Sequence, residues 1–338
     1  MKQLKVLFSL LGDQNKASSR VRGFWIAEEL EKQGIQCRIL HGSIFKTSTQ
    51  HLIKLRHYDI IYFQKNCSKW HVILMKLANR LGKKTLFDLD DFPSKVNSPI
   101  TLYNAGRMMM QASAVMAGSP ALVEYAQQYN SNAVLLPTSV QLKHYTPLKK
   151  STSKKTVCLG WIGNGLHYGD DLVNILLKPL QRLGTRQQVQ FRIVGACGNA
   201  QLYNAFSQIQ GVETIFIDQI EWNNPAAIQE QVEKFDIGLY PLLDNNFNRY
   251  KCGFKALEYM AIHIPVITSP VGVMSNIIEH DKEGYLASTN DEWTNALQSL
   301  TASSTLRKKM GMAGRKKVEN YYNIKKTAHQ LFEMLHSL

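Results

Sequence analysis

The chain has 338 residues, more than the roughly 250–300 that one hydrophobic core usually supports, so we expect two domains. Hydrophobic residues make up 44% and charged residues 20%, which excludes extensive disorder and is ordinary for a globular protein. The net charge of +14 would suit nucleic acid, an anionic membrane surface or a phosphorylated ligand. The sequence carries no RNP, zinc-finger or helix-turn-helix signature, so we expect no nucleic acid among its partners.

The sequence also indicates a reduced, cytoplasmic environment. No apolar run reaches the roughly 18 residues that a membrane-spanning helix needs. Residues 1–16 have a basic start and an apolar core, as a signal peptide does, but they lack a small-x-small cleavage site and fit a buried strand better. The five cysteines are scattered and lack the spacing of metal ligands, so we expect no metal site, and no cofactor is expected either.

Strand-like and helix-like segments alternate along the first half of the chain. Residues 5–11 form a continuous apolar run, which is typical of a parallel strand buried on both faces. Further strands are expected at 35–40, 59–64, 84–90, 114–119 and 133–137, with helices at 21–33, 69–82 and 120–128. This order predicts a doubly wound α/β domain.

Residues 138–155 lose this alternation, gain Ser, Thr, Lys and Pro, and fit a linker. The pattern then restarts, with strands expected at 156–163, 191–195, 212–217, 236–242 and 264–269 and a helical stretch over the last forty residues. The architecture that we infer is two Rossmann-like domains facing across a cleft. Parallel sheets bind ligands at the carboxyl ends of their strands, so the loops there are the candidate site.

One such loop, GNGLHYGDD at 163–171, lies between an expected strand and an expected helix. Gly163, Gly165 and Gly169 allow a tight turn with exposed N–H groups, and the start of a helix favours an anion such as phosphate. The alternative is a plain glycine-rich turn capped by Asp170, because the spacing matches neither GxGxxG nor a P-loop.

A second loop lies in the stretch RYKCGFKALEYMAIHIPVITSPVG at 249–272. Lys255 and Glu258 are three residues apart near an expected helix start, with Lys251 just outside it. Cations at a helix N-terminus suit a diphosphate, and a carboxylate one turn later can accept hydrogen bonds from the two hydroxyls of a ribose. The alternative is a surface Lys–Glu pair, although the apolar residues around the pair predict a half-buried helix whose charges need partners.

Five segments in the second half of the chain, and three in the first, carry a resemblance to a known family. FDIGLYPL, NRYKCGFKALEYMA, IPVITSPVG and EGYLA follow one another over 235–287, after CLGWIGNGLHYGDDL around the glycine loop. They resemble the C-terminal domain of GT-B glycosyltransferases, specifically the retaining family four (group 1). LFDLDD, AGSPALVEYAQQY and LLP in the first half resemble the acceptor domain of that family more loosely. The resemblance implies an acceptor-side domain over 1–145, a nucleotide-sugar-binding domain over 156–320, and a C-terminal helix over 321–338 that packs back on the first domain.

The resemblance implies an enzyme, a hexosyl- or related transferase acting in polysaccharide biosynthesis, whose donor is a nucleotide-diphosphate sugar. Glu258 matches the second glutamate of the Glu-x7-Glu signature of the family, which binds the donor ribose. The other donor-binding residues that it implies are Lys251 and Arg249 on the diphosphate, Gly163 and Asn164 through backbone amides, and Gly272 close to the donor sugar. Tyr250 stands where the first signature glutamate is expected, which affects the choice of sugar. His263 replaces a helix-ending glycine, and we expect it to be structural.

The implied mechanism retains the anomeric configuration and needs neither a protein nucleophile nor a metal ion. Cations neutralise the leaving diphosphate, and Lys255 is the expected catalytic cation. Asp90 and Asp91, at the end of a strand of the first domain, are candidates for orienting the acceptor, with helix capping or loop solvation as the alternative. Arg20 and Arg22 are candidates for contacting phosphates of donor or acceptor.

The acceptor expected from the resemblance is a glycan, lipid-linked or other hydroxyl. Two other functions are left open: an isomerase of the nucleotide-sugar 2-epimerase kind, and a non-catalytic basic protein that binds polyanions or membrane. Residues 69–84, KWHVILMKLANRLGKK, combine an apolar core with basic ends and predict a helix that contacts an anionic leaflet, on the cytoplasmic face of a membrane. The alternative for this helix is ordinary packing on the sheet.

Overall fold

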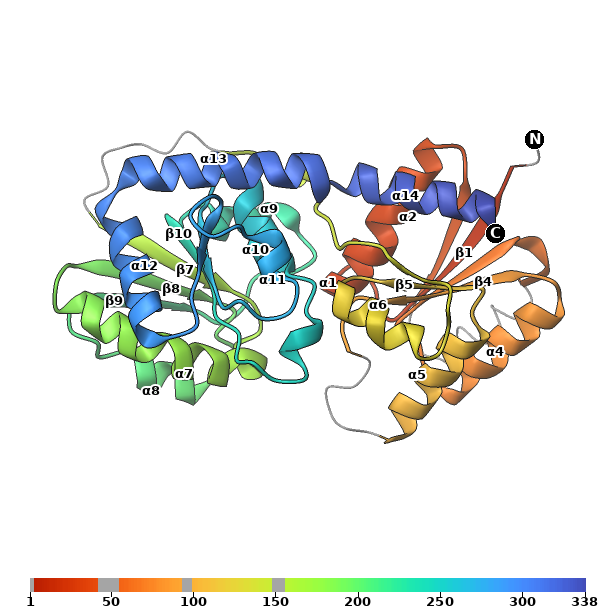
Figure 1. Cartoon of the computed structure of the whole chain (residues 1–338), viewed down its shortest axis with the longest axis horizontal. Helices are drawn as coiled ribbons and strands as arrows, with labels where there is room; N and C mark the ends of the chain where they lie inside the picture. The colour runs from red at the N-terminus through yellow and green to blue at the C-terminus, as the bar shows by residue number, and fades with distance from the viewer. Residues whose placement is uncertain (1–2, 42–54, 93–98, 148–155) are drawn as a thin grey trace. The chain divides into compact units, whose positions relative to one another are not determined.

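The computed structural model describes residues 3–41, 55–92, 99–147 and 156–338, which fold into two compact units (Figure 1). The first unit consists of Met1–Gln141, Arg249–Cys252 and Tyr322–Leu338, and the second of Leu142–Asn248 and Gly253–Tyr321. Helix α14 (Ile324–Ser337) packs against α2 (Trp25–Lys32), so the two ends of the chain belong to the same unit. Residues 148–155 of the expected linker lie outside the described residues.

The first unit is built on a parallel sheet of six strands in the order β2-β1-β3-β4-β5-β6. The strands are β1 (Lys5–Leu10), β2 (Gln36–His41), β3 (Ile60–Gln64), β4 (Lys84–Leu89), β5 (Ala114–Ala117) and β6 (Ala133–Leu135). A short helix α1 (Ala17–Ser19) continues through a π-helical turn (Arg20–Phe24) into α2, and the other helices are α4 (Lys69–Arg80), α5 (Pro99–Gln111), α6 (Pro120–Gln127) and α14.

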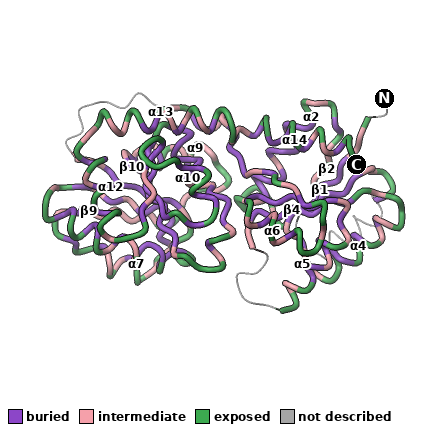
Figure 2. Tube along the Cα trace, viewed as in Figure 1, coloured by how far each residue is buried: buried purple, intermediate pink, exposed green. Residues whose placement is uncertain are grey.

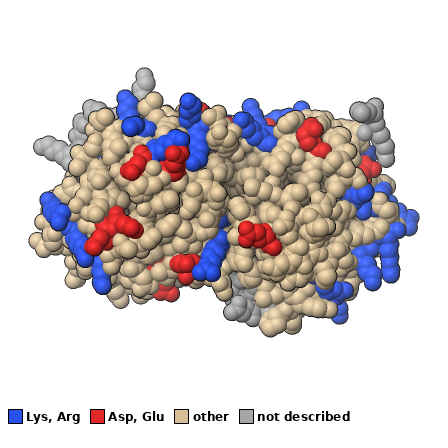
Figure 3. Space-filling view, viewed as in Figure 1, with Lys and Arg blue, Asp and Glu red and all other residues tan. Residues whose placement is uncertain are grey.

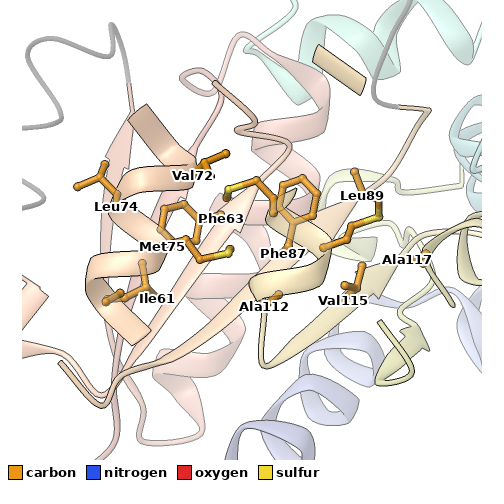
Figure 4. Packing of buried hydrophobic residues seen from close by; sticks show 14 of the residues in the cluster. Ile61, Phe63, Val72, Leu74, Met75, Phe87, Leu89, Ala112, Val115 and Ala117 are labelled. Carbon is orange, nitrogen blue, oxygen red and sulfur yellow. The ribbon is translucent and has the colours of Figure 1, made fainter. Parts of the chain in front are cut away.

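The core of this unit lies between the sheet and its helices. The inner strands β3 and β5 are buried along their whole length, which explains their mostly apolar sequences. Their neighbours β1 and β4 are buried beyond their first residue (Figure 2). Phe63 from β3, Phe87 from β4 and Met75 from α4 belong to one fully buried cluster (Figure 4). Ser68 and Ser119 cap the starts of α4 and α6 with their hydroxyls, which fixes the residue at which each helix begins.

Arg22 and Asp88 form a buried ion pair in the first unit. Arg22 and Asp88 are each at most 1% exposed, and two guanidinium nitrogens donate to the two carboxylate oxygens, with Nε–Oδ2 at 3.2 Å. A third nitrogen, Nη1, donates to the carbonyl oxygen of Leu136 at 2.6 Å. The expected phosphate contact is therefore wrong for Arg22, because its donors serve Asp88 and a backbone carbonyl. Arg20 is also buried, and its Nη1 donates to the carbonyl oxygen of Gln14 at 2.7 Å.

The second unit repeats the design with a parallel sheet in the order β12-β11-β10-β7-β8-β9. The strands are β7 (Val157–Ile162), β8 (Val189–Val194), β9 (Val212–Ile217), β10 (Ile237–Tyr240), β11 (Val266–Thr268) and β12 (Gly284–Leu286). The helices are α7 (Gly165–Gly184), α8 (Ala200–Phe206), α9 (Pro225–Val232), α10 (Phe254–Ala261), α11 (Met274–Ile277), α12 (Asn290–Ala302) and α13 (Ser304–Tyr321).

Two six-stranded parallel sheets confirm the doubly wound α/β class, and the expected strands lie within a few residues of their observed bounds. Several elements were not expected, among them β12, α5 and α12. β12 has only three residues, too few for a periodicity, and α5 carries apolar residues on its exposed face as well as its buried one, which hides the helical pattern. Across the part of the chain that the structure describes, no helix has the length and apolar character needed to cross a membrane.

Candidate functional site

The glycine loop lies between the end of β7 and the start of α7, at the carboxyl edge of the second sheet. Gly163 continues the sheet by donating its N–H to the carbonyl oxygen of Val194 at 2.9 Å, and Gly165 donates to Gly195 at 2.7 Å. Asn164 is the N-cap residue of α7 but makes no capping bond with its side chain. The expected cap, Asp170, lies inside the helix, so the capped-turn interpretation of this loop is wrong.

Lys255 lies in the first turn of α10 and its side chain passes directly over Gly163. A Cβ on Gly163 would come within 2.5 Å of the Lys255 Cε and within 2.8 Å of the rigid ring of Trp161, so glycine suits this approach. The helix starts sharply because Gly253 adopts a left-handed conformation (φ 70°) immediately before it. The glycine loop and the start of α10 thus meet at one point of the second unit.

Three aromatic rings surround the ammonium group of Lys255. Its Nζ lies 4.1 Å from the ring centroid of Tyr168, 5.0 Å from that of Tyr240 and 5.8 Å from that of Trp161. These rings are 7%, 2% and 0% exposed, so little water reaches them. The faces of aromatic rings attract a cation most strongly where water is excluded. We call Tyr168, Tyr240 and Trp161 the aromatic cage of Lys255.

Asp171, on the second turn of α7, lies near this ammonium group. Its Oδ1 accepts hydrogen bonds from the backbone N–H of Leu243 at 2.8 Å and from Asn248 Nδ2 at 2.6 Å. Burial raises the pKa of Asp171 above its ordinary value, while the hydrogen bonds and the charge of Lys255 oppose that shift. The sequence analysis missed Asp171, although it is adjacent to the Asp170 that was considered.

Glu258 is buried one turn further along α10. Its Oε1 accepts a hydrogen bond of 2.7 Å from the hydroxyl of Tyr145, which is itself 1% exposed. Arg315 holds the backbone there by donating from Nη1 to the carbonyl oxygen of Tyr145 at 2.7 Å and also to that of Ala261. Tyr145 was missed because it lies in a stretch whose composition predicts a linker, and only its aromatic ring among polar neighbours hinted at burial.

Gly272, a donor-site candidate, and His263, an expected structural residue, both lie in turns of the second unit. Gly272 is exposed and adopts a left-handed conformation (φ 60°), next to the segment that follows β11. His263 is left-handed as well (φ 66°) at the end of α10, which agrees with a structural role in place of glycine.

Residues 249–252 belong to the first unit. Arg249 is exposed, whereas Lys251 is 7% exposed and pairs with Asp91, with Nζ–Oδ1 at 3.2 Å. Tyr250 stacks on Phe92, with ring centroids 4.8 Å apart and an interplanar angle of 22°. The tyrosine at the position of the expected first glutamate is therefore part of an aromatic contact in the first unit.

Asp90 and Asp91 follow β4, where Lys65 joins them. Lys65 Nζ lies 3.1 Å from Asp90 Oδ1 and 3.2 Å from Asp91 Oδ2. Burial alone would raise the pKa of Asp91, but the ammonium groups of Lys65 and Lys251 outweigh it and hold that pKa well below its usual value. The same carboxylates raise the pKa of Lys65 against the effect of burial. This arrangement keeps Asp91 ionised near neutral pH, as a hydrogen-bond acceptor.

Residues 156–303 match the family model described as "Glycosyl transferases group 1". The matched segment contains Gly163, Lys255, Glu258 and Gly272. No curated protein matches the sequence.

Solved structures resemble the whole chain. HepE of Anabaena in complex with UDP superposes with a TM-score of 0.74 at 14% identity, over 99% of this chain and 100% of that one. Sucrose-phosphate synthase of Thermosynechococcus elongatus gives 0.73 at 14% identity, over 99% of both chains. A putative UDP-N-acetylglucosamine 2-epimerase of Listeria monocytogenes gives 0.63 at 8% identity, over 98% of this chain and 95% of that one. At such identities the similarity establishes the fold, and it confirms the expected GT-B architecture.

Proposed function

We propose that the chain is a glycosyltransferase that moves a sugar from a nucleotide-diphosphate sugar to a hydroxyl acceptor with retention of configuration. Two findings support this proposal: residues 156–303 match the group 1 glycosyl transferase model, and the chain has a GT-B fold. The observation that carries the proposal is the position of Lys255. Its ammonium group is held by the aromatic cage at the glycine loop, beside the start of a helix whose N–H groups favour an anion.

Lys255 is the proposed catalytic residue. When the bond between the sugar and the diphosphate breaks, negative charge grows on the leaving diphosphate. A fixed cation stabilises that charge more in the transition state than in the bound donor, and the donor needs no divalent metal ion for this purpose. The backbone amide of Asn164 would contribute a further hydrogen bond to the diphosphate. The expected amide contact through Gly163 is not available, because its N–H donates to the carbonyl oxygen of Val194. Lys251, Arg249 and Gly272 remain proposed contacts of the nucleotide sugar.

Glu258 is the proposed ribose ligand. A carboxylate can accept hydrogen bonds from both ribose hydroxyls, and the Tyr145 hydroxyl fixes the orientation of the carboxylate from one side. On the acceptor side, we propose that Asp90 and Asp91 orient the hydroxyl that attacks. The low pKa of Asp91 suits a group that accepts a hydrogen bond from this hydroxyl.

The proposed acceptor is a glycan or a lipid-linked hydroxyl. A lipid-linked acceptor requires the protein to reach an anionic leaflet, and we propose a peripheral contact through α4. This helix exposes Trp70 to 50% and carries no Asp or Glu, which suits the interface of a membrane.

Incubation with a panel of nucleotide sugars tests the function. A transferase releases the nucleotide only when an acceptor hydroxyl is supplied, and the sugar appears on the acceptor. Nucleotide release together with a free epimerised sugar, without any acceptor, would identify a 2-epimerase instead. Absence of both turnover and nucleotide binding would favour a non-catalytic polyanion-binding protein.

Replacing Glu258 with glutamine should weaken nucleotide binding by roughly 10- to 100-fold. Glutamine keeps the size of the side chain but loses charge-assisted hydrogen bonds worth about 1.5–3 kcal/mol. Calorimetric titration with UDP and with uridine measures the effect, which should persist for uridine because both contain the ribose.

Glu230→Gln is the matched control, since Glu230 is an exposed residue of α9 in the same unit. A folded Glu258→Gln protein that binds both ligands as tightly as the wild type would rule out a ribose ligand at this position.

A further inference from the structure

Two neighbouring helices of the first unit expose apolar side chains. α4 and α5 are joined by a hydrogen bond of 2.7 Å from Asn79 Nδ2 to the carbonyl oxygen of Gln111. The exposed apolar residues are Trp70 (50%) and Ile73 (45%) on α4, and Ile100 (73%), Tyr103 (65%) and Met110 (58%) on α5. The spacing of three or seven residues within each helix places them on its outer face, where a solvated helix normally carries polar residues.

Cations lie among these apolar residues. Lys76, Arg80 and Arg107 line a hollow of about 500 Å³ between the two helices, together with Asn79 and Gln111. Neither helix contains an acidic residue, and no carboxylate in the described ranges lies within ion-pair distance of the three cations. Lys and Arg side chains gather at the right-hand edge of Figure 3, over α4. The hollow is therefore positively charged and matches an anion.

We propose that this hollow binds the phosphate of an anionic phospholipid headgroup while the surrounding apolar side chains enter the leaflet. The inference rests on the peripheral contact proposed above and assigns its ligand site. Arginine guanidinium groups match phosphate oxygens geometrically, and an amphipathic surface with tryptophan and tyrosine among cations suits the headgroup level. The apolar residues favour a lipid surface over a soluble anion, because a soluble anion would make no apolar contact that strengthens its binding.

Co-sedimentation with vesicles tests the site. We expect binding to vesicles that contain one-third phosphatidylglycerol, and none to pure phosphatidylcholine. Arg80→Gln/Arg107→Gln should lower the partition coefficient by about 25-fold, since each cation near an anionic leaflet contributes roughly a factor of five. Ile73→Ser/Met110→Ser should weaken binding at high salt, where only the apolar contact remains.

The matched control is Lys308→Gln/Lys309→Gln, which removes the same charge from the exposed face of α13 and should change binding less than twofold. An equal loss in both charge variants would overturn the site in favour of diffuse attraction by net charge. Displacement from the vesicles by millimolar inorganic phosphate would overturn it in favour of a soluble anion. Should the Arg80/Arg107 variant fail to fold, Lys76→Gln on the exposed face of α4 replaces it, with an expected fivefold loss.

The outcome for this site is separable from the outcome for the enzyme. Wild-type protein that binds no anionic vesicle would refute both the peripheral contact and the headgroup site, and its UDP affinity would remain an independent measure of the donor site. Both α4 and α5 variants should keep wild-type UDP affinity and melting temperature.

Discussion

Replacing Lys255 with alanine should lower kcat by about 100- to 1000-fold, the usual loss when one preorganised group that stabilises developing charge is removed. The donor diphosphate is already charged before the reaction, so donor affinity should fall as well, but by less than kcat. Uridine lacks the diphosphate, and its affinity should not change. This pattern separates Lys255 from Glu258, whose replacement should weaken uridine binding.

The aromatic cage supplies the reason for so large an effect. An ammonium group between Tyr168, Tyr240 and Trp161 is held in place before the donor arrives, so little reorganisation accompanies the reaction. Tyr168→Leu should loosen the ammonium group and lower kcat by a smaller factor, because the charge itself remains. Tyr168→Phe keeps the ring face and should restore most of the rate.

Steady-state kinetics with a melting curve for each variant provide the measurement. Lys308→Ala, at an exposed position of α13, is the matched lysine control and should behave as wild type. A folded Lys255→Ala enzyme with an unchanged kcat would refute the proposed role. Lys255 would then be an ordinary surface lysine, whose removal lowers the free energy of unfolding by only a few tenths of a kcal/mol.

Replacing Arg22 with methionine should destabilise the first unit by about 3–5 kcal/mol. The variant leaves the carboxylate of Asp88 buried without its main partner, and it also removes the donor to Leu136. Hydrogen exchange of the β3 and β4 amides is the suitable measurement, because it reports on the first unit separately from the second.

The double variant Arg22→Met/Asp88→Leu is the control for this prediction. Removing both charges eliminates the unpaired carboxylate, so much of the lost stability should return. A single variant that loses less than about 1 kcal/mol would show that Asp88 finds another partner or becomes protonated at little cost.

The sheets could be predicted from the sequence because buried parallel strands need unbroken apolar runs, as in β3 and β7. The proximity of Gly163 and Lys255 could also be predicted, because both residues lie at the carboxyl edge of one sheet. The aromatic cage was not, since its rings come from β7, α7 and β10, and their convergence depends on strand order rather than on spacing along the chain.

Local sequence features gave a wrong expectation at two places, one through composition and one through position in a helix. The stretch before 156 is polar and rich in lysine, yet Tyr145 within it is buried against Glu258, a tertiary contact that local composition does not reveal. Arg22 suited a phosphate contact by its position at the start of a helix, but the π-helical turn at Arg20–Phe24 carries it into the core next to Asp88. Buried ion pairs of this kind join residues far apart in the sequence, here 22 and 88.

Thermal unfolding of the wild-type protein, Lys255→Ala and Glu258→Gln with UDP, GDP and ADP tests the donor site most directly. A nucleotide at 100 times its Kd should stabilise the wild type by about 2.7 kcal/mol, which raises Tm measurably. The account predicts that at least one nucleoside diphosphate raises the Tm of the wild type, and that the same concentration raises it less for both variants. Two results would contradict the assignment of Lys255 and Glu258 to the donor site. In the first, none of the three nucleotides changes the Tm of the wild type. In the second, the nucleotide raises the Tm equally in all three proteins.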